Sequence, residues 1–288
     1  MNFRIGFHVS IAGGIQNSVS SAVDIGCSAF QIFTRNPRGW VERKLVDFEI
    51  ESFKSNLKKS GIQNNSIAVH MPYLPNLSGP DSEIYEKSKE SFTNELIRCS
   101  RLGIEYLVIH LGSHRGMGKD NGTKQLLKSC EEAVNNYKST FKKKLNVTIL
   151  LENSAGQKDS IGSTLEEIRE ILDKLSSKAY GVCLDTCHAF VSGYDLKNAD
   201  ACNEFMDKFD NIVGFDVLKF IHLNDSKGDV GSHLDRHEHI GLGKIGIDGL
   251  KSILNMKSLK DLPVIMETPI DSTRDNSKNL QVVLDLRK

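Results

Sequence analysis

Histidine, aspartate and glutamate residues end a series of short apolar runs along this chain. The runs IAVH, YLVIH, VTILLE, GVCLD, LKFIH and PVIME end at His70, His110, Glu152, Asp185, His222 and Glu267. These residue types bind zinc and related metals. Because such a residue follows each of six successive runs, we expect the six side chains to converge on one metal site.

Two short segments add further ligand-type residues. LDTCH places His188 three residues after Asp185, and SHLDRHEH places His237 two residues after Asp235. Nine such residues exceed the needs of one tetrahedral ion, and carboxylates can bridge ions, so the pattern indicates two or three metals. Taken singly, each residue has an ordinary alternative as a hydrogen-bonded histidine, a helix cap or part of a solvated loop. If these nine side chains gathered in one place without cations, charge repulsion and desolvation would destabilise the protein strongly.

The remaining histidines give a weaker signal. His8 closes the first apolar run and is left open, with a hydrogen bond to a metal ligand as one interpretation. His114 and His239 are expected at the periphery, and His233 is left unassigned. The cysteines form no C-x-x-C pair. Cys183 and Cys187 lie near the expected site, and we favour packing over a ligand role for both.

Strand and helix patterns alternate along the whole chain. The apolar runs suit parallel strands covered on both faces, and they are predicted at 3–9, 29–33, 67–70, 106–111, 147–153, 180–186, 218–224 and 263–268. Eight β-then-α units predict an α/β protein with a (β/α)8 TIM barrel, a single domain over residues 1–288. A doubly wound open sheet is the alternative. In TIM barrels the functional residues lie at the C-terminal ends of several strands. Metal-binding residue types end six of the predicted strands here, so the barrel is favoured.

Helices are predicted between the strands from periodicity and end signals. The predicted ranges are 15–25, 48–59, 82–102, a helix after 121, one ending at 175, 198–212, 248–254 and 273–286. Gly26, Gly61 and Gly103 are expected to end the first three. Ser163 and Glu166 have the S-x-x-E spacing of a capping box that would open the helix ending at 175.

Composition places few limits on the partner. The chain has 288 residues, of which 39% are hydrophobic, with 37 basic and 37 acidic side chains. This neutral balance gives no sign of a nucleic-acid partner, although a basic face is compatible with a neutral total. The start MNFRIGFHV is too short and too polar for a signal peptide, and no run approaches the ~20 apolar residues of a membrane span. We therefore expect an intracellular, cytoplasmic protein with reduced thiols and no membrane partner.

These motifs together resemble those of the endonuclease IV family, zinc-dependent apurinic/apyrimidinic endonucleases of base excision repair. The matching stretches are HVSIAGG, QIFTRNPRGW, VHMPYLPNL, VIHLGSHRG, ILLENSAG, GVCLDTCHAF, IHLNDSKGDVGSHLDRHEHIGLGKIG and IMETP. The resemblance implies three zinc ions per chain, with manganese at some sites as a variant. It assigns His70, His110 and Glu152 to the first ion, Glu152, Asp185, His222 and Glu267 to the second, and His188, Asp235 and His237 to the third. Catalysis would depend on Glu152 and Glu267.

The resemblance also implies a substrate, double-stranded DNA containing abasic sites, cut 5′ to the lesion to leave a 3′-hydroxyl and a 5′-deoxyribose phosphate. Tyr73 and Leu74 match an intercalating pair, Arg38 matches an inserted arginine, and Arg35 is expected to contact phosphate. Packing of the loop and solvated surface are the ordinary alternatives for these four residues. Pro37 and Gly39 flank Arg38 and will restrain its loop.

Two other functions compete with this interpretation. A metal-dependent sugar isomerase or epimerase of the same barrel type would bind a small polyol, and the set His188, Asp235 and His237 argues against it. A DNA-damage binding protein without activity is disfavoured by nine intact ligand positions. Nothing in the sequence indicates an obligate oligomer. We therefore expect a monomer, associated with the nucleoid when it acts on DNA.

Overall fold

A closed barrel of parallel strands forms the centre of the molecule. The computed structural model describes residues 3–175 and 178–287, and within them eight strands close in the order β1-β10-β7-β6-β5-β4-β3-β2. The strands are β1 Ile5–Val9, β2 Ala29–Ile32, β3 Ile67–His70, β4 Tyr106–His110, β5 Thr148–Glu152, β6 Tyr180–Asp185, β7 Leu218–His222 and β10 Val264–Met266. The predicted (β/α)8 barrel is confirmed, and the open sheet is wrong. Residues 1–2, 176–177 and 288 of the predicted domain lie outside the described residues.

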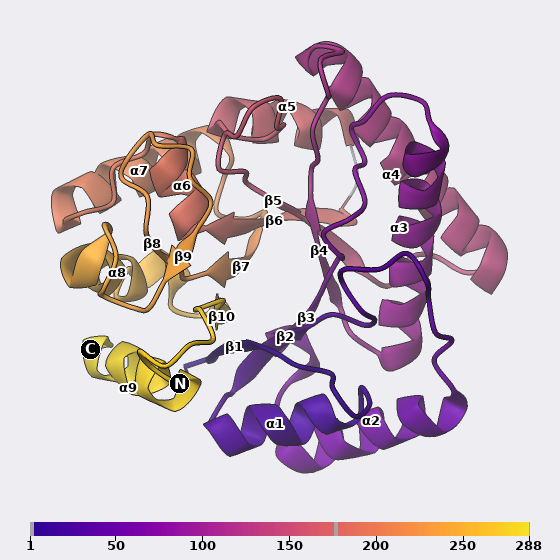
Figure 1. Ribbon diagram of the computed structural model, residues 1–288, viewed down its shortest axis with the longest axis horizontal. Coiled ribbons are helices and arrows are strands. Elements are labelled where there is room, and N and C mark those ends of the chain that lie inside the picture. The colour runs from indigo at the N-terminus through magenta and orange to yellow at the C-terminus, as the bar shows by residue number, and fades with distance from the viewer. Residues whose placement is uncertain (1–2, 176–177, 288) are drawn as a thin grey trace.

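Helices surround the strands on the outside of the barrel (Figure 1). They are α1 Asn17–Ile25, α2 Asp47–Ser60, α3 Glu83–Leu102, α4 Lys119–Phe141, α5 Leu165–Leu175, α6 Thr186–Ser192, α7 Ala199–Ile212, α8 Gly246–Leu254 and α9 Asn276–Leu286, with short 3-10 turns at Asn64–Ser66 and Lys257–Leu259. Two features near the barrel mouth were not predicted from the sequence. They are α6, which begins directly after Asp185, and a hairpin of β8 Asp225–Ser226 with β9 His237–Glu238.

Helix ends follow the sequence signals, with one correction. Gly26, Gly61 and Gly103 follow α1, α2 and α3 with left-handed φ angles of 96°, 74° and 77°. The predicted capping box of Ser163 and Glu166 is displaced by one residue. The hydroxyl of Thr164 accepts from the backbone N–H of Glu167, and the Glu167 carboxylate accepts from the N–H of Gly162 and of Ser163. The same spacing is present at Thr164, and the helix starts one residue later than the sequence suggested.

The barrel interior is built in layers that place polar side chains above apolar ones. The lower layer consists of Ala29, Ala68, Val108, Leu150, Cys183, Phe220 and Ile265. In β1 the corresponding position is Gly6, where an added Cβ would lie 1.7 Å from the carbonyl oxygen of Ala29. Strand side chains alternate between faces, so the residue two positions later also points inward. Those residues are His8, Gln31, His70, His110, Glu152, Asp185, His222 and Glu267. Alternation therefore puts a ring of polar side chains at the C-terminal mouth.

A larger apolar core fills the space between the strands and the helices. It includes Phe7, Phe30 and Ile32 on the outward faces of strands, and Phe53 and Phe92 on helices, all fully or almost fully buried. This two-sided burial explains why the strands read as nearly continuous apolar runs. Across the described ranges, every helix is too short or too polar to span a bilayer.

Candidate metal centre

Glu152 lies at the centre of the polar layer and faces histidines from several strands. Its Oε2 atom lies 3.1 Å from Nε2 of His70 and 3.1 Å from Nε2 of His110. Its Oε1 atom lies 3.0 Å from Nδ1 of His222 and 3.5 Å from Nδ1 of His188. The carboxylate is 1% exposed. One oxygen therefore faces His70 and His110, and the other oxygen faces Nδ1 of His222, as a bridging carboxylate requires.

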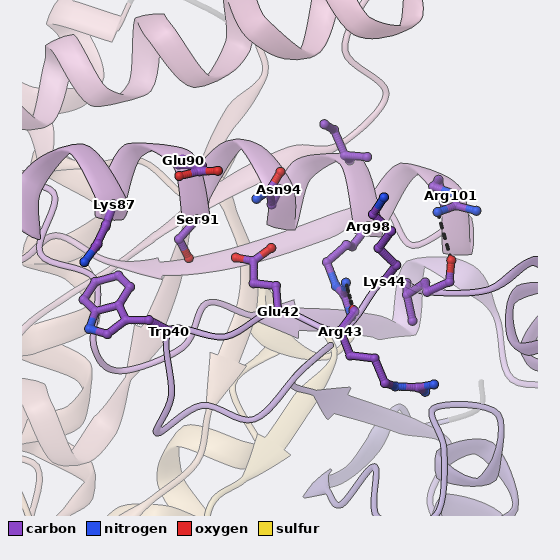
Figure 2. Close-up of a pocket in the computed structure, with 12 residues that line it drawn as sticks. Trp40, Glu42, Arg43, Lys44, Lys87, Glu90, Ser91, Asn94, Arg98 and Arg101 are labelled. Carbon is purple, nitrogen blue, oxygen red and sulfur yellow. Dashed lines mark hydrogen bonds between the residues drawn. The ribbon is translucent and has the colours of Figure 1, made fainter.

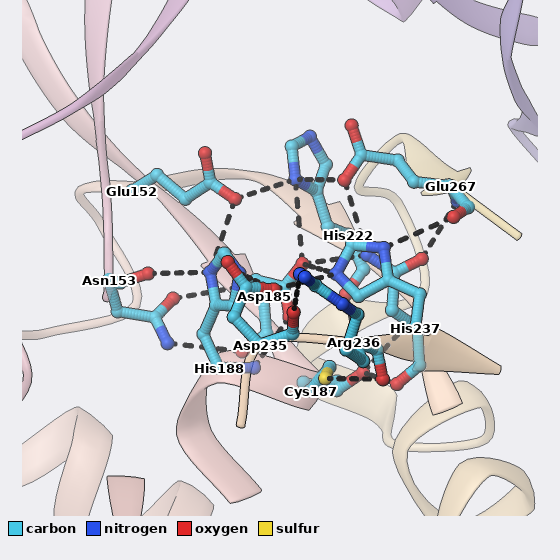
Figure 3. A network of polar contacts seen from close by, with 12 residues as sticks. Glu152, Asn153, Asp185, Cys187, His188, His222, Asp235, Arg236, His237 and Glu267 are labelled. Carbon is cyan, nitrogen blue, oxygen red and sulfur yellow. Dashed lines mark hydrogen bonds and ion pairs between the residues drawn. The ribbon is translucent and has the colours of Figure 1, made fainter. Parts of the chain in front are cut away.

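Within the described residues, three groups of ligand-type side chains have ligand atoms within 4.8 Å of one another. They are His70, His110 and Glu152; Glu152, Asp185, His222 and Glu267; and Asp185, His188 and His237. Figure 3 shows most of these side chains in one polar network. The first two groups have the composition that the resemblance implied. In the third group Asp185 takes the place expected for Asp235, but Asp235 is adjacent, with Oδ1 3.2 Å from Nε2 of His188 and 3.8 Å from Nε2 of His237.

Three of the histidines are held in one orientation by backbone carbonyl groups. Nδ1 of His70 lies 2.7 Å from the carbonyl oxygen of Met71, Nδ1 of His188 lies 2.9 Å from that of Asn153, and Nδ1 of His237 lies 3.1 Å from that of Glu267. A carbonyl oxygen only accepts, so each Nδ1 carries the proton and donates it. In the neutral ring Nε2 then keeps its lone pair and faces the carboxylates, which is the tautomer that a metal-binding histidine needs.

His237 supplies a test of whether these residues fit a cation. It lies on β9, and pairing with β8 folds the segment 225–238 back over the barrel mouth. Its Nε2 atom is buried and has no hydrogen-bond partner among the residues that the structure describes, because the nearest oxygens of Asp185 and Asp235 are 3.7 and 3.8 Å away. A buried nitrogen without a partner is costly. A cation between these three side chains would satisfy it, so the donor set fits a metal ion.

Electrostatics keep the carboxylates charged despite their burial. Burial raises the pKa of Glu152, but His110 and His222 outweigh it and hold the pKa well below 4.5. In the same way, burial opposes the charge of Asp235, whereas His188 and His237 lower its pKa to about 2. Both groups are therefore anionic at neutral pH, the form that binds cations.

Sequence reasoning missed two buried amides that bind the ligand-type residues. Asn224 donates from Nδ2 to Asp185 at 2.7 Å and to Glu267 at 3.3 Å. Gln31 donates from Nε2 to Glu267 at 2.8 Å. The signal for Gln31 was present, because it is a polar residue in the apolar run AFQIF at the inward register of the layer. Asn224 lies two residues beyond the histidine that ends its strand.

A cavity of about 280 Å³ opens beside the cluster, and Tyr73 and Leu74 line it together with His110, Glu152, His188 and Asp235. Tyr73 is 58% exposed and Leu74 is 37% exposed. The Tyr73 ring packs edge-on against Phe33 with centroids 5.2 Å apart. Two large apolar side chains therefore stand exposed at the entrance to the site.

Arg35 does not lie where the sequence interpretation put it. Its side chain is 2% exposed and pairs with Glu95 at 3.1 Å. The guanidinium also donates to the hydroxyl of Ser91 and to the carbonyl of Gly39, both at 2.6 Å. All these partners belong to α3 or to its own loop, so Arg35 holds the loop, and its burial does not favour the phosphate contact that the sequence predicts. Arg38 is exposed, as a contact to an external partner would require.

The loop that carries Arg38 is anchored along α3. Arg98 donates to the hydroxyl of Thr34 at 2.6 Å and to the carbonyl of Arg43 at 2.9 Å. Figure 2 shows α3 running beside the segment that carries Trp40, and a groove of about 450 Å³ lies between them. Buried hydrogen bonds therefore position this loop at the edge of the mouth.

The remaining histidines and cysteines have defined surroundings. His8 contacts Gln31 at 3.0 Å and Glu267 at 3.5 Å, next to one of the ligand-type residues. His114 lies near Asp159, His233 lies 3.0 Å from the carbonyl of Ala155, and the buried His239 pairs with Asp271 at 3.0 Å. All six cysteines are buried free thiols, and none belongs to the three groups formed by the described residues.

A closed (β/α)8 barrel with histidines and carboxylates gathered at its mouth defines a class of metal-binding barrel proteins, and residues 19–286 match the family described as xylose isomerase-like TIM barrel. The chain belongs to that family and, within it, to the endonuclease 4 family. It is 50% identical to the probable endonuclease 4 of Nitrosopumilus maritimus, covering 96% of this chain and 98% of that one.

Two further proteins agree with this assignment. Apurinic-apyrimidinic endonuclease 1 of Plasmodium berghei is 43% identical over 96% of this chain and 53% of its own length. The crystal structure of endonuclease IV from Thermus thermophilus superposes with a TM-score of 0.86 at 35% identity, covering 98% of both chains. Because these relatives carry the endonuclease name at such identity, a sugar isomerase or epimerase is not favoured.

Proposed function

We propose that this protein is a zinc-dependent endonuclease that hydrolyses the phosphodiester 5′ to an abasic site in double-stranded DNA. The products would be a 3′-hydroxyl and a 5′-deoxyribose phosphate. One observation carries the proposal: Glu152 places its two carboxylate oxygens against two different sets of histidines, within a cluster that gathers residues from position 70 to position 267. A site of this kind suits several cations close together, as phosphodiester hydrolysis commonly uses.

The proposed ligands are the nine residues of the cluster, which would hold three zinc ions. They are His70, His110, Glu152, Asp185, His188, His222, Asp235, His237 and Glu267. Histidine nitrogens with carboxylate oxygens are a usual zinc donor set, although manganese at some positions would suit the same carboxylates. When bound, zinc supplies Lewis-acid chemistry by lowering the pKa of water to about 7 and by neutralising a phosphodiester.

Glu267 is the carboxylate that we propose to handle the proton of the attacking water. Its side chain is 16% exposed, whereas Glu152 is 1% exposed and Asp185 is fully buried. Burial opposes its charge, but His222, His8 and His70 outweigh burial and hold its pKa well below 4.5. Glu267 is therefore an anion with access to the mouth and can accept a proton on a carboxylate oxygen.

Tyr73, Leu74 and Arg38 are proposed to hold the DNA. An abasic nucleotide must leave the helix to reach a barrel mouth, which costs a few kcal/mol. The exposed side chains of Tyr73 and Leu74 stand at the entrance and can replace the lost stacking. Arg38 is exposed on a loop whose base is held by Arg98. We further propose that the protein acts as a monomer inside the cell, at the nucleoid.

Elemental analysis together with a cleavage assay tests the proposal. Purified protein should contain about three zinc ions per chain and should cut a duplex with a single abasic site, but not the intact duplex. One or two manganese or magnesium ions and turnover of a sugar would instead indicate an isomerase. Folded, zinc-loaded protein that binds the abasic duplex and never cuts it would indicate a binding protein and would overturn the proposed activity.

A further inference from the structure

A buried glutamine on β2 reaches across the polar layer to residues of two distant strands. Gln31 is 0% exposed, and its Nε2 lies 2.8 Å from Oε1 of Glu267, which follows β10. Its Oε1 lies 2.9 Å from Nε2 of His222 on β7. These partners are 236 and 191 positions away in the chain. Gln31 therefore contacts two members of the same ligand-type group without belonging to it.

The chemistry of the partners fixes which end of the amide faces which residue. A carboxylate only accepts hydrogen bonds, so the amide nitrogen of Gln31 must face Glu267 and the amide oxygen must face His222. An amide oxygen also only accepts, so Nε2 of His222 must carry a proton. Nδ1 of His222 is then the nitrogen whose lone pair can bind a metal. It is Nδ1 that faces the group, 3.0 Å from Glu152 and 3.5 Å from Glu267.

His222 is oriented oppositely to the histidines held by backbone carbonyls. His70, His188 and His237 bond a carbonyl through Nδ1 and present Nε2 to the cluster. His222 presents Nδ1, and its Nε2 is bonded to a side chain. Substitutions leave a backbone carbonyl in place, whereas a single substitution removes the amide of Gln31. The orientation of His222 is therefore the one that depends on the identity of a side chain.

We infer that Gln31 is a positioning residue that sets the tautomer of His222 and the orientation of Glu267, and thereby holds the metal group of Glu152, Asp185, His222 and Glu267. The inference rests on the proposed function, because it takes this group to bind zinc. Residues that orient metal ligands typically change metal affinity about 10- to 100-fold when they are replaced. The loss of affinity should concern one metal ion, because Gln31 contacts members of only one of the groups formed by the described residues.

The test compares Gln31→Met and Gln31→Leu with the wild-type protein. Both substitutions remove the amide at nearly constant volume, and the unbranched methionine serves if leucine prevents folding. Gln63→Leu makes the same chemical change at an exposed position on the opposite end of the barrel and is the matched control. Zinc content is measured after equilibration with increasing chelator, and the ¹⁵N shifts of the histidine rings report the tautomer of His222.

We expect the two Gln31 variants to lose one zinc ion per chain at a chelator concentration about 10- to 100-fold lower than the wild type, with the other ions unchanged. The ¹⁵N shifts should show that His222 no longer keeps its proton on Nε2. Gln63→Leu should match the wild type. Unchanged zinc retention and an unchanged His222 tautomer in a folded Gln31 variant would overturn the inference and leave the proposed function standing. A wild-type protein that binds no zinc would overturn the proposed function, and the inference with it.

Discussion

Glu152 and His222 are 70 positions apart in the chain, and in the folded protein Oε1 of Glu152 lies 3.0 Å from Nδ1 of His222. The other oxygen of the same carboxylate faces His70 and His110. Glu152 is thus shared between two ligand-type groups, and this arrangement determines what its replacement should do.

Glu152→Gln is expected to weaken the binding of two metal ions at once. The amide has nearly the same shape as the carboxylate but removes its negative charge from both groups. Cleavage of an abasic duplex should fall by about 100-fold or more. Metal content and cleavage rate are the measurements, and Glu170→Gln on the exposed face of α5 is the control. A variant with full metal content and the wild-type rate would contradict the bridging role.

Glu267→Gln is expected to abolish cleavage while binding to abasic DNA is retained. The substitution keeps the size of the side chain and its contact with Gln31, but it removes the proposed proton acceptor and one negative charge from the proposed metal group of Glu152, Asp185, His222 and Glu267. A single-turnover cleavage assay and a gel-shift titration separate the two effects. Unchanged cleavage would refute the role given to Glu267, and a loss of binding alone would place it in recognition.

Tyr73→Ala and Leu74→Ala should weaken binding to an abasic duplex by about 10-fold each, because a lost stacking contact costs ~1–3 kcal/mol. Both side chains are exposed, so the melting temperature should stay nearly constant. Phe48→Ala removes another exposed aromatic side chain, on α2, and should affect neither quantity. A lower melting temperature with unchanged binding would show that these residues only pack their loop.

Arg35 and Arg38 are close in sequence and should behave in opposite ways. Arg35→Ala leaves the buried carboxylate of Glu95 without its nearest ion-pair partner and is expected to cost about 3–5 kcal/mol of unfolding free energy. Arg38→Ala should change stability by no more than about 0.5 kcal/mol and should reduce DNA binding. Urea unfolding and a binding titration on both variants check this. Equal stability of the two variants would contradict the burial of Arg35.

The stability of metal-free protein should fall as the pH rises. Burial lowers the pKa of His188, but Asp185, Asp235 and Glu152 outweigh it and hold the pKa well above 6.5. A raised pKa contributes stability below pH 6.5, and this contribution disappears as the pH rises through the folded-state value. After chelator treatment, the melting temperature should therefore decrease as the pH rises above 6.5 and through the raised pKa of His188. Zinc-loaded protein should lack this decrease, because zinc binds deprotonated histidine. A flat profile for the metal-free protein would contradict the expectation.

The sequence by itself determined the strands, most helices and the residue types at the mouth. Runs of apolar residues that end in His70 or Glu152 are local patterns, and each barrel strand was found within a few residues of its predicted bounds. Alternation with a period of two also places Gln31 inside the barrel. Ala29, two residues earlier, belongs to the lower layer of the barrel interior, so Gln31 points to the same side.

Only the tertiary structure decided which residues meet and which atoms face each other. The burial of Arg35 depends on Glu95 of α3, and the tautomer of His222 depends on Gln31 from a strand across the barrel. The place of Asp185 in two groups depends on β9 folding over the mouth. Local periodicity sets the face on which a side chain lies, whereas partners from distant strands are brought within hydrogen-bond reach only when the barrel closes.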